Sequence, residues 1–172
     1  VIDFNSDISS GCYPVSINFT DLNYDPNNSG VSWDFDIDDS TSYTSSVDSS
    51  ITYTYTTPGS YGVSLTVENS FGCKDTLVQN GLISIAGPTG SFTMSDTLIC
   101  KDESVVFTPT VVNTNGFIWD FGNGIISTDS IPTYAYALGG SFIPILIIEN
   151  NSGCQFIVPQ NDTLVVREVI VD

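Results

Sequence analysis

The sequence has 172 residues, of which 41% are hydrophobic, so it is long and apolar enough to bury one or two globular cores. Its 20 acidic and 3 basic residues give a net charge of -17, which argues against binding to nucleic acid or to anionic lipid and leaves cationic partners open. No window approaches the ~18 consecutive apolar residues of a membrane span, so direct membrane insertion is not expected. The chain opens on Val1 without the pattern of a signal peptide, and we expect any export signal to lie outside this segment.

Strand-like alternation of apolar and polar residues begins early in the chain. Val15, Ile17 and Phe19 share one face of a predicted strand. The same period recurs in three further segments, 31–35, 51–56 and 61–67. Turn-forming Asn, Asp, Pro and Gly residues separate these segments, and no amphipathic helix pattern competes with them. Many short strands at regular spacing predict an all-β fold, an antiparallel β-sandwich in which two sheets share one core.

The second half of the chain repeats the first. The stretch from Gly59 to Cys73 returns as the stretch from Gly140 to Cys154, and both copies end in Glu-Asn-x-x-Gly-Cys. A Tyr-x-Tyr pair precedes each copy, and a Trp-Asp-Phe triplet lies further back in each. Internal self-similarity of this kind indicates one unit built twice. With a short linker near Ala86, we predict two tandem domains, 1–87 and 88–172, placed end to end with restricted motion.

The Trp-Asp-Phe triplets, with the Tyr-x-Tyr pairs and closing strands that follow them, resemble the polycystic kidney disease (PKD) domain family. The family signature is Trp-Asp-Phe-Gly-Asp-Gly, and both repeats depart from it. Asn123 replaces the second Asp in repeat 2, and Asp36-Ile-Asp-Asp39 stands in place of the Gly-Asp-Gly turn in repeat 1. The resemblance implies an immunoglobulin-like sandwich for both repeats. The chain is also similar to the tandem arrays of large flavobacterial surface adhesins, including the gliding-motility type. This similarity implies a location at the cell surface.

Each repeat has two cysteines in matching positions, Cys12 with Cys73 and Cys100 with Cys154. Four cysteines allow three pairings, and we favour pairing within each repeat because repeats fold as units. Each bridge would then stabilise its repeat by roughly 4 kcal/mol in the chain-entropy model. Zinc binding is the alternative, but the sequence has no histidine and no Cys-x-x-Cys spacing. Disulfides predict an oxidising, extracellular compartment.

The residues usual in acyl and phosphoryl transfer are scarce in this chain. It has no histidine, and its basic residues are Lys74, Lys101 and Arg167. Paired carboxylates could still catalyse glycoside hydrolysis, but that reaction needs two acids across a cleft, and a small sandwich with a filled core offers none. We therefore predict that the protein is not an enzyme.

An acidic run in repeat 1 supplies the candidate metal ligands, Asp34, Asp36, Asp38 and Asp39. Carboxylates crowded on a turn suit calcium, which is the only cofactor that the sequence suggests. The run is not an EF-hand, because a serine stands where the bidentate Glu is required. The alternative is a solvated outer face followed by an acidic loop. The family resemblance adds Asp21 and Asp25 as rival calcium ligands, since some family members bind calcium near the domain edge.

One strand face changes character between the repeats. Alignment puts Ile143, Ile145 and Ile147 of repeat 2 where repeat 1 has Gly62, Ser64 and Thr66 on the outer face. Three outward isoleucines predict an apolar patch that could contact a domain or partner. The alternatives are that a loop covers the patch, or that Pro144 changes the strand register.

Together these patterns predict a non-catalytic extracellular repeat module, a stalk or display element of a bacterial surface adhesin. Its predicted partners are neighbouring repeats of the same chain, with a surface polysaccharide or protein as candidate ligand. Cell adhesion and gliding motility are implied by the resemblance. The alternative is a substrate-binding accessory module of a secreted polysaccharide- or protein-degrading enzyme, which should expose a row of aromatic residues for sugar stacking.

Overall fold

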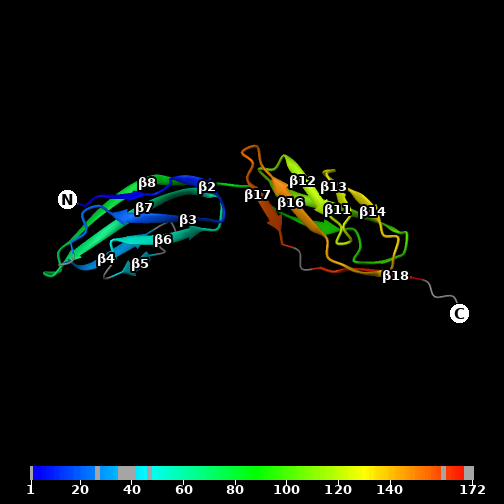
Figure 1. The fold of residues 1–172 in the computed structure, drawn as a ribbon, viewed down its shortest axis with the longest axis horizontal. Helices are drawn as coiled ribbons and strands as arrows, with labels where there is room; N and C mark the ends of the chain where they lie inside the picture. Colours follow the sequence, from blue (N-terminus) through cyan, green and yellow to red (C-terminus); the bar gives the residue numbers. More distant parts are fainter. Residues whose placement is uncertain (1, 26–27, 35–41, 46–47, 160–161, 169–172) are drawn as a thin grey trace. The chain divides into compact units, whose positions relative to one another are not determined.

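The computed structural model describes residues 2–25, 28–34, 42–45, 48–159 and 162–168. The chain divides into two compact units, Val1–Ala86 and Gly87–Asp172, which contain repeat 1 and repeat 2 (Figure 1). Within the described ranges the regular structure consists of β-strands alone, so the all-β prediction is confirmed. Nothing in these ranges forms a helix that could carry the chain across a bilayer.

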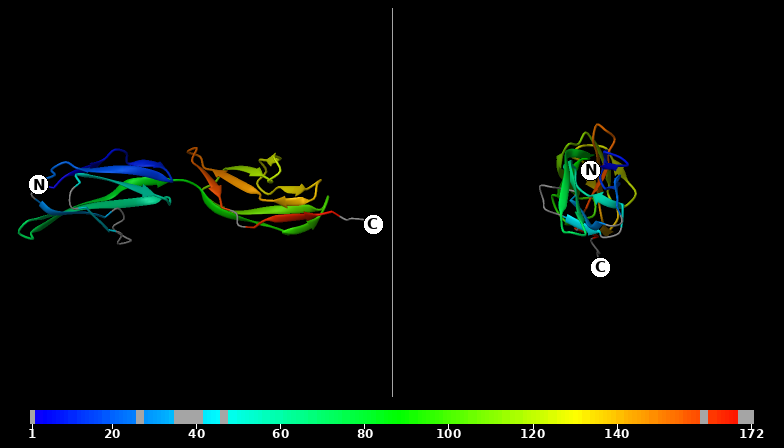
Figure 2. Two further views of the ribbon diagram at one scale, coloured as in Figure 1. Left: turned by 60° about the horizontal axis from the view of Figure 1, so that its bottom comes forward. Right: turned by 90° about the vertical axis from the view of Figure 1, so that its left-hand side faces the viewer.

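The described residues of repeat 1 form two sheets (Figure 2). The smaller sheet contains, in order, β1 (Phe4–Ser6), β3 (Val15–Asp21) and β6 (Ser50–Tyr55). The larger contains β2 (Ser10–Cys12), β8 (Lys74–Ala86), β7 (Gly59–Asn69), β4 (Asn28–Asp34) and β5 (Ser42–Ser45). All pairs are antiparallel except β2 with β8, which is parallel. The parallel pair arises because the first strand segment changes sheets between β1 and β2.

Repeat 2 follows the same order with more interruptions. One sheet contains β14 (Thr133–Ala135), β11 (Ser104–Val112) and β9 (Thr89–Met94). A second contains β13 (Ile126–Ser127), β12 (Gly116–Asp120), β16 (Ile145–Glu149) and β17 (Gln155–Val158). A third contains β10 (Leu98–Cys100), β18 (Leu164–Arg167) and β15 (Gly140–Phe142), with β10 and β18 parallel.

The interruptions fall where proline enters the repeated strands. In repeat 1, β7 is continuous, with a shift of register between Tyr61 and Val63. The equivalent strand of repeat 2 is broken into β15 and β16 by Ile143 and Pro144, because proline has no N–H to donate to a ladder. Pro159 follows β17 where β8 of repeat 1 runs on. The sequence suggests a change of strand register at Pro144, whereas the structure has a break in the strand at this point.

A buried tryptophan stands at the centre of each core. Trp33 and Trp119 are both fully buried. The ring of Phe4 meets Trp33 edge-on at 5.2 Å and 83°, and the ring of Phe92 meets Trp119 at 5.0 Å and 83°. Edge-to-face pairs of this kind add ~0.5–1.5 kcal/mol beyond the area that they bury. The same aromatic contact thus recurs at equivalent positions of the two repeats.

The alternation seen in the sequence is the basis of this packing. In β3, Ile17 and Phe19 are fully buried, and Val15 at the start of the strand is half-buried. In β4, Val31 and Trp33 are buried as predicted. Burying side chains of this size contributes ~1.5–3 kcal/mol each relative to leaving them exposed.

Candidate functional site

The Trp-Asp-Phe-Gly motif of repeat 2 forms a closed turn after β12. The backbone N–H of Gly122 donates to Asp120 Oδ1 at 2.8 Å, and the N–H of Ile125 donates to Asn123 Oδ1 at 3.2 Å. Gly122 has a φ of +79°, and a β-carbon there would lie 2.8 Å from the backbone of Ile143. The first glycine of the motif is therefore required by both backbone conformation and space.

Aromatic residues fix this turn to the core. Tyr136 is fully buried, and its hydroxyl donates to the carbonyl oxygen of Phe121 at 2.8 Å. The Phe121 ring stacks on Tyr134 with centroids 4.2 Å apart, and Asn123 Nδ2 donates to the Tyr134 hydroxyl at 3.0 Å. Burial, followed by the nearby Tyr134 and Asp120, raises the pKa of Tyr136 far above its ordinary value. The motif thus acts as a structural device that joins the turn to the core.

The predicted calcium ligands are only partly described. Asp36, Asp38 and Asp39 lie outside the described residues, and Asp34 is the last residue of β4. Across the described ranges, no three acidic or sulfur side chains are grouped so that they could hold a metal ion. Asp21 and Asp25, the rival ligands, are among the residues to which this statement applies. Calcium binding in repeat 1 stays a prediction.

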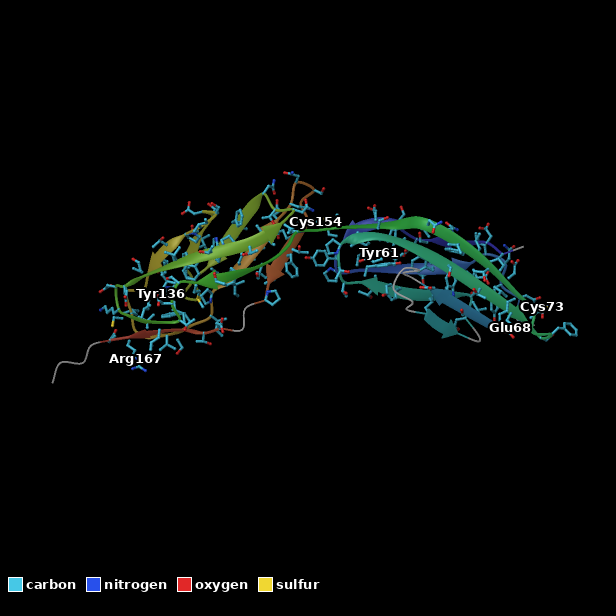
Figure 3. The ribbon with its side chains drawn as sticks, turned by 180° about the vertical axis from the view of Figure 1, so that it is seen from behind. Tyr61, Glu68, Cys73, Tyr136, Cys154 and Arg167 are labelled. Atoms are coloured by element: carbon cyan, nitrogen blue, oxygen red, sulfur yellow. The ribbon has the colours of Figure 1, made fainter. Side chains whose placement is uncertain are left out.

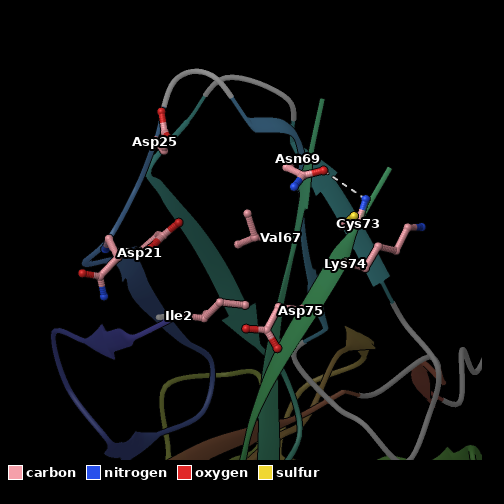
Figure 4. Close-up of a pocket in the computed structure, with 9 residues that line it drawn as sticks. Ile2, Asp21, Asp25, Val67, Asn69, Cys73, Lys74 and Asp75 are labelled. Atoms are coloured by element: carbon pink, nitrogen blue, oxygen red, sulfur yellow. Dashed lines mark hydrogen bonds between the residues drawn. The ribbon is translucent and has the colours of Figure 1, made fainter. Parts of the chain in front are cut away.

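The rival ligands line a polar pocket of about 330 Å³ in repeat 1 (Figure 4). Asp21 and Asp25 face it from the end of β3 and the loop beyond, and Asp75 faces it from β8. Asp21 is buried, and its Oδ1 accepts a hydrogen bond from the N–H of Asn23 at 2.9 Å. The Lys74 ammonium at the rim lies 3.3 Å from Glu68 Oε2. The pocket is therefore lined by three carboxylates together with the side chains of Asn23, Asn69 and Lys74.

The predicted disulfide pairing is wrong. Cys73 and Cys100 are exposed free thiols, whereas Cys12 and Cys154 are disulfide-bonded, so neither repeat closes its own bridge. In repeat 1 the reason is the length of β8. Cys73 directly precedes this strand of 13 residues, and Cys12 pairs with its last residue, Ala86. At ~3.3 Å per residue the two cysteines are about 40 Å apart, whereas a disulfide needs Cα atoms within ~7 Å.

Repeat 2 separates its cysteines in the same way. Cys100 pairs with Arg167, the last residue of β18, and Cys154 lies at the other end of the unit (Figure 3). The equivalence of the cysteines between repeats was visible in the sequence. Their separation was not, because it depends on how far the last strand runs without turning.

The predicted contact surface is exposed. Ile143 and Ile145 are exposed and Ile147 is half-buried, whereas Leu146 and Ile148 between and beside them are fully buried in the core. No part of repeat 2 that the structure describes covers the two exposed isoleucines. Whether this surface binds anything stays a prediction.

The exposed surface is wider than the sequence suggested. In the β12–β16–β17 ladder, Ile147 lies opposite Ile118 on one side and Ile157 on the other. Directly opposite residues share a face, so these three form a cross-strand row, in which Ile157 is 62% exposed. We call this row, with Ile143 and Ile145, the isoleucine face. Ile118 could have been found in the sequence, because it precedes the inward Trp119 and must point outward.

Repeat 1 builds the same row from polar residues. Ser32, Thr66 and Thr76 occupy the equivalent positions of its β4–β7–β8 ladder. The hydroxyls of Thr66 and Thr76 are hydrogen-bonded at 2.8 Å. The apolar face is therefore a property of repeat 2 and not of the fold.

Comparison with known proteins bears on the first repeat. Residues 4–82 match the family model of the PKD domain. This match begins at β1 and extends into β8, so it covers nearly all of repeat 1. No curated protein matches the chain.

Several solved structures are similar to the chain. Carbohydrate-binding modules of the β-sandwich superfamily are 28% identical over 51% of this chain and 37% of theirs, with a TM-score of 0.46. The fibronectin(III)-like modules of Clostridium thermocellum CbhA are 12% identical over 96% of this chain and 95% of theirs, with a TM-score of 0.38. The Bacteroides ovatus mixed-linkage glucan protein SGBP-B is 15% identical over 92% of this chain and 42% of its own, with a TM-score of 0.34. The chain thus spans little more than a third of the carbohydrate-binding structure.

Proposed function

We propose that this chain is a non-catalytic extracellular repeat module that serves as a stalk or display element of a bacterial cell-surface adhesin. The observation that carries the proposal is the duplication of one filled β-sandwich, with the same aromatic contact at Trp33 and Trp119. A domain that is repeated with its core intact and its outer face changed extends a chain and varies its surface. The PKD match over residues 4–82 supports the same assignment.

The disulfide-bonded cysteines and the net charge support an extracellular location. Cys12 and Cys154 are disulfide-bonded, and such bonds persist in oxidising environments outside the cytosol. A net charge of -17 keeps a long exposed segment soluble and repels nucleic acid. A role in gliding motility rests on the similarity to flavobacterial adhesins alone.

The residues that line the pocket in repeat 1 support a non-catalytic role. Its lining offers carboxylates and one ammonium group, that of Lys74, which lies beside Glu68. General acid–base catalysis by two carboxylates needs them on opposite sides of a bound sugar, whereas Asp21 is buried and its Oδ1 already accepts a hydrogen bond from the N–H of Asn23.

The alternative is an accessory module that binds the substrate of a secreted enzyme. Such modules hold sugars by stacking them on exposed aromatic rings. Among the aromatic residues whose side chains the structure describes, Phe71 alone is exposed, at 90%. One ring on a hairpin turn is not a row, which favours the stalk over the sugar-binding module.

Replacing the segment in its parent protein distinguishes the two functions. We expect that exchanging residues 1–172 for an unrelated pair of β-sandwich domains preserves adhesion of the cells, because a stalk contributes length rather than a binding site. Deleting the segment should reduce adhesion. A binding module would behave differently: the exchange would abolish function, and the isolated protein would bind a soluble polysaccharide and lose that binding in a Phe71→Ala variant.

A further inference from the structure

Three asparagines of the chain are each followed directly by a glycine: Asn80, Asn115 and Asn123. Asparagine is among the thermolabile residues of proteins, and it reacts fastest when a glycine follows it. The backbone nitrogen of the next residue attacks the side-chain amide carbon, and a glycine leaves that approach open because it has no β-carbon. All three asparagines are exposed, so exposure to water does not distinguish them.

The first strand of one sheet in repeat 2 restrains Asn115. Its backbone N–H donates to the Glu149 carbonyl at 2.9 Å, and Gly116 after it lies opposite Glu149 in the pairing of β12 with β16. Its side-chain Nδ2 donates to Asn151 Oδ1. Attack on the Asn115 amide therefore requires this side-chain hydrogen bond to break and the start of β12 to move.

Asn123 is held at both ends of its side-chain amide. Its Oδ1 accepts from the N–H of Ile125 at 3.2 Å, and its Nδ2 donates to the Tyr134 hydroxyl at 3.0 Å. The Tyr134 ring is itself stacked on Phe121, with centroids 4.2 Å apart. Both hydrogen bonds must break before the amide carbon of Asn123 can meet the nitrogen of Gly124.

Asn80 has no restraint of this kind on its side chain. It lies in β8 at the shift of register between Tyr61 and Val63 of β7, where the ladder pairing skips residues 80–82. Gly81 has a φ of +61°, the left-handed backbone that glycine adopts in a bulge. The Asn80 side chain forms no hydrogen bond with any residue that the structure describes. The amide of Asn80 is thus free to turn toward the next nitrogen.

We propose that Asn80 is a site of spontaneous modification, at which the folded protein converts asparagine to aspartate and isoaspartate. The nitrogen of Gly81 loses its proton to hydroxide and bonds to Cγ of Asn80. The bond from Cγ to Nδ2 breaks, and the amide nitrogen takes up a proton and leaves as ammonia. The product is a five-membered succinimide ring.

Water then opens the ring at either of its two carbonyl carbons. Cleavage of the bond between Cγ and the Gly81 nitrogen gives aspartate. Cleavage of the bond between the backbone carbonyl carbon and that nitrogen gives isoaspartate, in which the main chain runs through Cβ and Cγ. Water is consumed, ammonia is released, and no other reactant is needed.

The modification adds one negative charge and, as isoaspartate, one backbone atom to β8. Residues 80–82 already interrupt the ladder, so the extra atom leaves the pairs on either side intact. The same reaction at Asn123 would supply the aspartate of the family signature, but it would remove the donor to Tyr134. The structure therefore directs the reaction to the asparagine whose change disturbs the fold least.

Incubation of the folded 172-residue protein at mildly alkaline pH tests the site. Aliquots are digested with pepsin at acidic pH, and mass spectrometry follows deamidation of the three asparagines, with electron-transfer fragmentation to distinguish aspartate from isoaspartate. One net hydrogen bond is equivalent to a factor of about five, so we expect Asn80 to react at least about fivefold faster than Asn115 or Asn123. Equal rates at the three sites, or a faster reaction at either of the other two, would overturn the proposal.

The same measurement in concentrated guanidinium chloride separates the fold from the local sequence. The unfolded chain keeps a glycine after each asparagine and loses the hydrogen bonds, so the three rates should converge. If Asn80 reacts faster by the same factor in the unfolded chain, the difference comes from the local sequence and the assignment to the bulge of β8 is wrong.

Tyr134→Phe provides a matched variant. It removes the hydroxyl that accepts from Asn123 Nδ2 and keeps the ring that stacks on Phe121. We expect deamidation at Asn123 to become about fivefold faster, while the rate at Asn80 stays that of the wild type. An unchanged rate at Asn123 would contradict protection by hydrogen bonding, and with it the reason for assigning the modification to Asn80.

Discussion

Gly122 shows how one residue fixes the Trp-Asp-Phe-Gly turn of repeat 2 to the sandwich. Its φ of +79° lies in the left-handed region, and a β-carbon would meet the backbone nitrogen and oxygen of Ile143 at 2.8 Å. We expect Gly122→Ala to destabilise repeat 2 by more than ~2 kcal/mol, because left-handed backbone alone costs a side chain ~1–2 kcal/mol. Hydrogen exchange with mass spectrometry reads the unfolding of each repeat separately.

Gly124 is the matched control for this substitution. It has a φ of +85°, but nothing lies within 4 Å of the position that a β-carbon would take there. Gly124→Ala should therefore cost only the ~1–2 kcal/mol that comes from the backbone conformation. Equal losses in the two variants would show that the approach of Ile143 contributes nothing.

Tyr136 links stability to pH. Burial, then Tyr134 and Asp120, raise its pKa above the ordinary value of 10.0, so the folded domain keeps the phenol protonated where the unfolded chain releases the proton. The stability that this provides is present below pH ~10 and is lost as pH rises from there through the folded pKa. We expect repeat 2 to lose up to ~1.4 kcal/mol per pH unit above pH ~10 from this group.

The Tyr136→Phe variant separates this effect from the general alkaline response. It should be less stable at pH ~7 by about 1–3 kcal/mol, because the Phe121 carbonyl loses its buried donor. Its stability should then fall less steeply than that of the wild type at alkaline pH. Parallel curves from urea unfolding would contradict the assigned role of Tyr136.

At the scale of elements, the isoleucine face distinguishes the repeats. Ile145 is 38% exposed and Leu146 beside it is fully buried. We expect Ile145→Thr to change the free energy of unfolding of repeat 2 by less than ~1 kcal/mol, whereas Leu146→Ala should cost ~2–5 kcal/mol. Thermal melting of the full chain measures both. A loss from Ile145→Thr as large as that from Leu146→Ala would make the face part of the core and remove it as a candidate contact surface.

The presence of the strands could be predicted from the sequence, but the residues at which they end could not. Alternation placed Ile17, Phe19 and Trp33 in the core, because a period of two is a local property that neighbouring residues already fix. The pairing of Cys12 with Cys73 was wrong because it depends on the uninterrupted run of β8, a property of the whole sheet. The breadth of the isoleucine face likewise needed the register of three strands, which brings Ile118 and Ile157 to either side of Ile147.

At the scale of the molecule, the two repeats share the contacts of their cores and differ in their surfaces. The two units share the edge-on contact of a Phe ring with a Trp ring, and each has its two cysteines at opposite ends of the unit. What differs lies outside the cores: the pocket and polar row of repeat 1, and the isoleucine face of repeat 2. This distribution is what a repeat module requires, since a shared interior preserves the fold while the exterior is free to change.

Labelling of intact cells tests the central claim, that this segment is displayed outside the cell, most directly. An antiserum raised against the 172-residue protein is applied to unpermeabilised cells that produce the parent protein, before and after brief treatment with an external protease. We predict strong labelling that the protease removes while a cytoplasmic marker stays intact. Labelling that appears only after the cells are lysed would contradict the extracellular role.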